Sequence, residues 1–131
     1  MKKDIESRMD IECLVNKFYD RARHNPLLGN IFDIVIKVNW DKHLPKMYDF
    51  WENIVFQTGN YKGHPFFAHL AVNNKENLTS EHFKTWLTLW FQSIDDLFEG
   101  PMAEELKQKS KNIKEVWNYK MDYINNYTPK G

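Results

Sequence analysis

Residues 79–98 read TSEHFKTWLTLWFQSIDDLF, and this stretch decides the fold. Its apolar positions recur with the spacing of one broad helix face: Phe83, Trp86, Leu87, Trp90, Phe91, Ile94, Leu97 and Phe98. Such a wide apolar stripe is typical of a helix at the centre of a domain. Gly100 and Pro101 end the pattern. Because proline is favoured at the first position of a helix, a new helix is predicted to begin there.

Helical spacing continues on both sides of this central segment. The apolar residues after Pro101 predict a last helix, with a polar tail beyond it: Met102, Leu106, Ile113, Trp117, Met121 and Ile124. Near the N-terminus, Asp10 is a predicted N-cap, and His24-Asn25-Pro26 is predicted to end the helix. The apolar face between these points consists of Ile11, Leu14, Val15, Phe18, Tyr19 and Ala22.

A further amphipathic pattern begins near Trp40 and stops at Thr58-Gly59-Asn60. The residues that share one face of this predicted helix are Trp40, His43, Leu44, Met47, Phe50, Trp51, Ile54 and Val55. Pro45 conflicts with a helix interior, because proline lacks an N–H and clashes with the preceding turn. Either the helix begins near Leu44, with Pro45 in its first position, or its opening turn is kinked.

The remaining segments are short. Residues 27–32 are apolar and predict one or two helical turns and a loop, while 59–65 are rich in turn residues. Residues 66–70 form another apolar segment, and 73–77 are predicted to be a polar loop. No segment alternates with period two for more than a few residues, so we expect an all-α protein whose helices pack on one another.

Composition limits the classes of function. A length of 131 residues suits one domain, and 18 basic against 18 acidic residues lack the excess charge of a nucleic-acid binder. No apolar run approaches 18 residues, and the N-terminus has no apolar secretory region, so we expect a cytoplasmic protein without a membrane partner. Cys13 has no disulfide partner and is predicted to be a buried thiol.

His43 and His69 differ from the other histidines because apolar and aromatic residues surround both. A buried imidazole needs a partner for its nitrogens. A hydrogen bond to the backbone is a more frequent partner than a metal ion. Tyr19 and Trp86 would add an O–H and an N–H donor to the interior. Together these four residues indicate a polar spot inside an apolar pocket. His64 lies among turn residues, so we expect it to be exposed.

The order of several sequence blocks resembles the truncated haemoglobins, and most closely their third group, over about residues 10–117. The blocks are Phe18-Tyr19, Leu28-Gly29-Asn30-Ile31-Phe32, the WxxHxxxxxxFW pattern from Trp40 to Trp51, Tyr61-x-Gly63-x-Pro65-x-x-x-His69-Leu70, and His82-Phe83-x-x-Trp86-Leu87-x-Leu89. The resemblance implies a shortened globin fold in which helices sandwich a haem b. We expect a single domain over 1–131, with a globin core at about 10–125.

The resemblance also implies roles for individual residues. His69 would be the proximal ligand of the iron, His43 the distal histidine and Tyr19 the distal tyrosine. Phe32 would wedge against the haem, and Trp86 would be the pocket tryptophan. Further haem contacts are expected from Phe18, Met47, Phe50, Trp51, Leu70 and Phe83. The haem propionates could meet Lys42, Lys46, Lys62 or His64, and the sequence leaves this choice open.

An imidazole on one face of a pentacoordinate ferrous haem would leave the other face free for O₂, NO or CO. Because Tyr19 and Trp86 would hold O₂ firmly, we expect redox chemistry, such as NO dioxygenation or peroxide reduction, rather than bulk O₂ delivery, and the resemblance is compatible with either reaction. The chain has no flavin or nicotinamide motif, so a reductase would be a separate protein. The alternative is a haem-free helical interaction domain whose aromatic residues form only a core.

Overall fold

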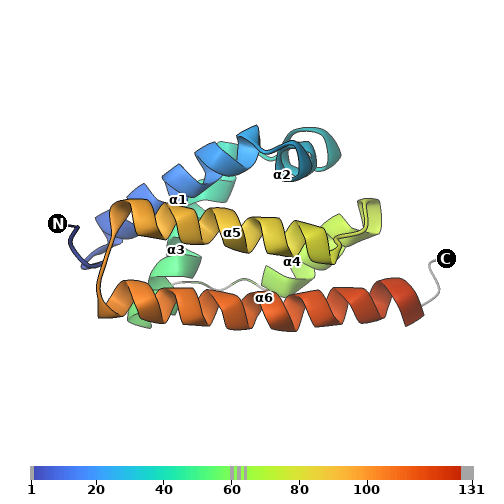
Figure 1. Ribbon diagram of the computed structural model, residues 1–131. Helices are drawn as coiled ribbons and strands as arrows, with labels where there is room; N and C mark the ends of the chain where they lie inside the picture. Colours follow the sequence, from blue (N-terminus) through green and yellow to red (C-terminus); the bar gives the residue numbers. More distant parts are fainter. Residues whose placement is uncertain (1, 60, 62, 64, 128–131) are drawn as a thin grey trace.

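The computed structural model describes residues 2–59, 61, 63 and 65–127, and the elements in these ranges are helical (Figure 1). In chain order they are α1 (Arg8–His24), α2 (Pro26–Asn30), the π-helical turn η1 (Ile31–Val35), α3 (Trp40–Phe56), α4 (Pro65–Lys75), α5 (Ser80–Leu97) and α6 (Pro101–Tyr127). No strand occurs in the described ranges. The expected all-α class is therefore confirmed.

Helices α5 and α6 lie side by side and run in opposite directions, as Figure 1 shows. The chain reverses at Gly100, where φ is 148° and an added Cβ would lie 2.5 Å from the carboxyl carbon of Asp4. The two oxygens of that carboxylate accept the backbone N–H groups of Met102 and Ala103, both at 2.9 Å. Asp4 thus caps α6, and the predicted break at Gly100-Pro101 is confirmed.

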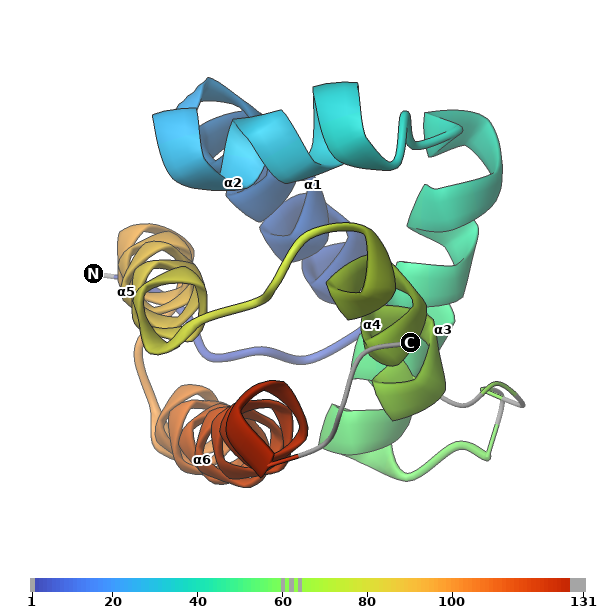
Figure 2. The ribbon, with the colours of Figure 1, turned by 90° about the vertical axis from the view of Figure 1, so that its right-hand side faces the viewer.

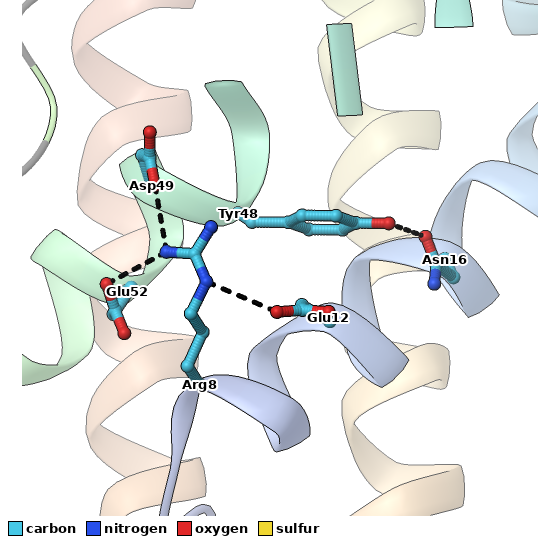
Figure 3. Close-up of polar contacts among 6 residues, drawn as sticks. All are labelled: Arg8, Glu12, Asn16, Tyr48, Asp49 and Glu52. Atoms are coloured by element: carbon cyan, nitrogen blue, oxygen red, sulfur yellow. Dashed lines mark hydrogen bonds and ion pairs between the residues drawn. The ribbon is translucent and has the colours of Figure 1, made fainter. Parts of the chain in front are cut away.

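Helix α1 packs against α2, α3 and α5, while α6 packs against α3, α4 and α5. Figure 2 looks along α5 and α6 and shows α4 near the middle, between α1 with α2 on one side and α6 on the other. An ion-pair cluster links α1 to α3 (Figure 3): Arg8 Nη1 lies 2.8 Å from Asp49 Oδ1 and 3.0 Å from Glu52 Oε1. Inside the described ranges no helix is long and apolar enough to cross a bilayer.

The beginning of α1 differs from its prediction. The helix starts at Arg8 with Ser7 as N-cap, so the prediction of Asp10 as the cap is wrong. Asp10 occupies the third helical position, where its Oδ2 accepts the backbone N–H groups of Glu6 at 2.8 Å and Ser7 at 3.2 Å. An acidic residue three positions after a serine completes a capping box, which explains the cap signal at Asp10.

Pro45 lies inside α3, because the helix begins at Trp40. A start near Leu44 is therefore wrong. Pro45 has no N–H to donate to the carbonyl of Asp41, one turn earlier, so the turn is kept by the contacts of the surrounding residues. The helix ends as predicted, before Thr58, with Gln57 in the left-handed region at φ 56°.

Two further predictions need correction. Helix α4 continues to Lys75, so the loop predicted over 73–77 begins later than expected. Asn73 is helical and 1% exposed, because its side chain has partners elsewhere in the fold.

Cys13 is exposed, so the prediction that its thiol is buried is wrong. It lies beside the apolar face of α1 rather than on it.

The buried side chains form two separate groups, whereas a small domain usually has one contiguous core. The group that we call the first core comes mainly from α1, α3, α5 and α6: Ile5, Ile11, Leu14, Val15, Phe18, Ala22, Leu28, Phe50, Trp51, Val55, Trp90, Ile94, Phe98, Ala103 and Leu106. The second core is smaller: Ile31, Leu78, Phe83 and Met121, with Val35, Ile36, Phe66, Leu70, Val72 and Trp117 packed against them.

Candidate functional site

His69 lies on α4, beside the second core. Its Nδ1 is 2.7 Å from the carbonyl oxygen of Pro65, one turn earlier, and its ring centroid is 4.6 Å from that of Trp117 on α6. A carbonyl oxygen can only accept, so Nδ1 carries the proton, and in a neutral ring Nε2 then carries a free lone pair. Burial lowers the pKa of His69, although the Pro65 bond acts in the opposite direction. The ring is therefore oriented by the Pro65 carbonyl and neutral at pH 7.

His43 lies on α3, beside the first core, and its Nε2 is 3.0 Å from Tyr19 Oη. The pKa of His43 is lowered, first by burial and then by the positive charges of His69 and Lys46. His69 and His43 are thus near enough for one to oppose protonation of the other.

Tyr19 is packed among aromatic rings. Its centroid lies 5.0 Å from Phe18, 5.5 Å from Phe32 and 5.1 Å from Trp40, each in an edge-on arrangement. Burial raises the pKa of Tyr19, so its hydroxyl stays protonated at any physiological pH. The sequence predicted that Tyr19, Phe32 and His43 share one site, and the fold brings these three side chains together.

Trp86 belongs to an aromatic stack and reaches Tyr19 only through a neighbour. Its ring centroid is 6.2 Å from Trp51 and 6.4 Å from Trp90, both stacked, and 6.3 Å from Phe18, which contacts Tyr19. Trp86 is half-buried, as expected of a side chain at the edge of the first core.

The other predicted contact residues divide between the two cores. Phe18, Phe50 and Trp51 are buried in the first core, and Met47 packs against it. Phe83 is buried in the second core, and Leu70 packs against it. Lys42 and Lys46 are exposed on α3. Lys62 and His64, which were also considered for the propionates, lie outside the described residues.

Sequence reasoning missed Trp117 and Trp40 as parts of the site. Trp117 contacts the ring of His69, and Trp40 contacts Tyr19, Phe32 and His43. Trp117 was recognised only as an apolar helix position, and Trp40 only as such a position and as the start of the WxxHxxxxxxFW pattern. No local signal relates Trp117 to a residue 48 positions earlier. For Trp40, its helical spacing to His43 was a usable signal.

The arrangement of these helices is that of a shortened all-α globin fold. A solved structure, the crystal structure of group III truncated hemoglobin from Campylobacter jejuni, matches with a TM-score of 0.80, 25% identity and coverage of 92% of this chain and 95% of that one. The group 3 truncated hemoglobin ctb of Campylobacter jejuni is 28% identical over 116 residues, which are 86% of this chain and 89% of the relative. The resemblance to the group III truncated haemoglobins is thereby confirmed. No family model matches the chain.

Proposed function

We propose that this chain binds haem b between the two cores, with His69 Nε2 as the protein ligand of the iron. The observation that carries the proposal is the bond from His69 Nδ1 to the Pro65 carbonyl, which leaves Nε2 as the lone-pair nitrogen. The donor set fits the group, since a neutral imidazole ligates iron and the surrounding side chains are aromatic and aliphatic. When bound, the haem would supply a ferrous iron that takes O₂, NO or CO opposite His69.

The residues around His69 prepare it for this role. The Pro65 carbonyl selects the tautomer, and Trp117 limits rotation of the ring. Leu70 and Phe83 belong to the neighbouring second core and would contribute apolar surface to the haem. On the opposite side, His43 Nε2 is already engaged by Tyr19, which favours a five-coordinate iron with its sixth position open to a gas.

Tyr19, His43 and Trp86 would act as the polar groups for the gas. Tyr19 and His43 share one hydrogen bond, so when the His43 N–H donates to Tyr19, the tyrosine O–H is free to donate to a ligand atom with partial negative charge. Hydrogen bonds to charged groups contribute about 1.5 to 3 kcal/mol, and those to partial charges somewhat less. One such bond would slow ligand release by roughly tenfold.

Slow release favours redox chemistry of O₂, NO or peroxide over bulk O₂ delivery. NO dioxygenation and peroxide reduction both need electrons, and the sequence has no flavin or nicotinamide motif. We therefore propose that a separate reductase supplies them. Tyr19 and His43 would keep the reacting gas oriented, and the aromatic wall of Phe32 and Trp86 would limit water at that position.

The absorption spectrum of the protein after addition of haem tests the proposal. We expect a Soret band at one haem per chain, and we expect His69→Ala to displace the band and weaken haem retention by at least about tenfold. His24→Ala is the matched control, because His24 Nδ1 makes the same bond to a carbonyl one turn earlier, that of Asp20 at 2.6 Å, but is exposed.

An unaltered spectrum in His69→Ala would refute the ligand assignment. The absence of any Soret band in the unaltered protein would instead support the alternative, a haem-free helical interaction domain.

A further inference from the structure

A reciprocal pair of amides joins α4, the helix of His69, to the end of α6. Asn73 Nδ2 donates to Asn125 Oδ1 at 2.9 Å, and Asn125 Nδ2 donates to Asn73 Oδ1 at 3.1 Å. Asn73 is 1% exposed. Each amide uses both its donor and its acceptor on the other, so the pair has one well-defined geometry.

The same pair also closes the connection between α4 and α5. The backbone N–H of Leu78 donates to Asn73 Oδ1 at 2.8 Å, and Asn125 Nδ2 lies 3.4 Å from the Leu78 carbonyl oxygen. A buried amide with satisfied hydrogen bonds is costly to move, because any displacement leaves polar atoms unpaired in the interior. The C-terminal end of α4 is thus fixed to α6 and to the start of α5.

The spacing along both helices relates this pair to His69. Asn73 is four residues after His69, one turn along the same face of α4, and Asn125 is eight residues after Trp117 on the same face of α6. Helix α6 therefore contacts α4 at two points, through Trp117 at the His69 ring and through Asn125 at Asn73. The ring contact is apolar and nondirectional, whereas the amide pair is directional.

We propose that Asn73 and Asn125 are positioning residues for His69. The amide pair fixes the rotation and the axial position of α4 relative to α6, and this keeps the His69 ring against Trp117 with Nε2 pointing into the interior. The part of this inference that is tested at the iron rests on the proposed function. The placement of the His69 ring against Trp117 does not depend on haem binding.

Asn125→Leu tests the inference, with Asn126→Leu as the matched control. Asn126 is the next residue of α6 and is exposed, and within the described part of the chain its hydrogen bonds go to Asp122 of the same helix. In the ferrous protein, resonance Raman spectroscopy would measure the iron–histidine stretching band. We expect Asn125→Leu to shift or broaden this band and to raise the rate of haem loss by about tenfold, while Asn126→Leu changes neither.

A second readout does not need the iron. The imidazole proton signals of His69 are displaced by the ring current of Trp117 at 4.6 Å, and NMR of the diamagnetic CO form, or of the chain itself where no haem binds, would detect them. We expect these signals to move in Asn125→Leu. In Asn125→Asp, which keeps the size and the acceptor oxygen but loses the N–H donor, we expect a smaller displacement in the same direction.

An iron–histidine band and imidazole signals that are both unaltered in a folded Asn125→Leu protein would overturn the inference, even with lowered thermal stability, because a purely structural role predicts that result. If Asn125→Leu does not fold, the same two readouts in Asn125→Asp decide the question. A missing Soret band in the unaltered protein would refute the proposed function, and the NMR readout would still test the positioning of His69.

Discussion

The first core and the second core differ in size, and His69 lies beside the smaller one. In the first core, Ile11, Leu14, Trp90 and Ile94 are 0% exposed, and Trp51 stacks on Trp90 at 4.4 Å. In α4, by contrast, Asn73 is the one side chain that is buried among those the structure describes. None of the described buried residues of the first core comes from α4, the helix that carries the candidate ligand.

A bound haem would need partly exposed apolar surface on α4 to cover. The apolar side chains of α4, Phe66, Leu70 and Val72, are half-exposed although they pack against the second core. A flat apolar group would cover such surface, and its binding would then stabilise α4 more than any other helix. Elements that bind ligands are commonly the less stable parts of a fold.

The largest expected effect is on the free energy of unfolding, and it is tested by one substitution in each core. Trp90→Ala removes a fully buried indole and its bond from Nε1 to Ser110 Oγ at 2.9 Å, so we expect a loss of about 3 to 5 kcal/mol in the free energy of unfolding. Trp117 is half-buried, and we expect Trp117→Ala to cost about 1 to 2 kcal/mol. Urea denaturation followed by circular dichroism measures both. Equal losses would mean that the two cores are equivalent.

The next largest effect is on the rate at which bound O₂ dissociates from the proposed distal side of the haem. Without the Tyr19 hydroxyl, the ligand loses one hydrogen bond, so we expect Tyr19→Phe to raise the O₂ dissociation rate by about tenfold, as measured by stopped-flow spectroscopy. Tyr48→Phe is the matched control, because the Tyr48 hydroxyl donates to Asn16 near the surface (Figure 3). An unchanged rate in both Tyr19→Phe and Trp86→Phe would contradict the distal roles of these residues.

The sequence was most informative where one element supplies its own signal. The apolar stripe of α5 and the Gly100-Pro101 break predicted two helices correctly, because a broad buried face and a proline at the first position are local features. The continuation of α4 through Asn73 was missed, since its buried amide has a partner 52 residues away. Pro45 lies inside α3 for the same reason: contacts outside the helix outweigh its local preference.

The candidate site divides in the same way. An interior polar spot was predictable from Tyr19, His43, His69 and Trp86, because each places a polar atom in an apolar pattern. Their individual roles came from the resemblance to the truncated haemoglobins and stay predictions. The contact of Trp117 with His69 has no local signature, since it depends on how α4 and α6 meet.

The smallest effect is a dependence of stability on pH that involves both cores. Burial lowers the pKa of His43 beside the first core, and of His69 and His82 on the other side. Below the ordinary histidine value of 6.5, the unfolded chain takes up protons that the folded chain resists. The stability contributed by these residues is thus fully present above about pH 6.5 and falls as the pH is lowered, by at most about 1.4 kcal/mol per pH unit for each residue.

His82→Gln isolates one part of this dependence. Nδ1 of His82 accepts the backbone N–H of Thr79 at 3.0 Å, as a capping-box residue at the start of α5, while its buried Nε2 has no partner among the described residues. Glutamine can accept the same N–H but does not titrate, so stability at about pH 7.5 should be kept and its fall toward about pH 5 should become shallower. Urea midpoints across this range measure the slope, with exposed His24→Gln as the control. A slope that is equal in His82→Gln and in the unaltered protein would assign the acid sensitivity to His43 and His69, whose pKa values are also lowered by burial.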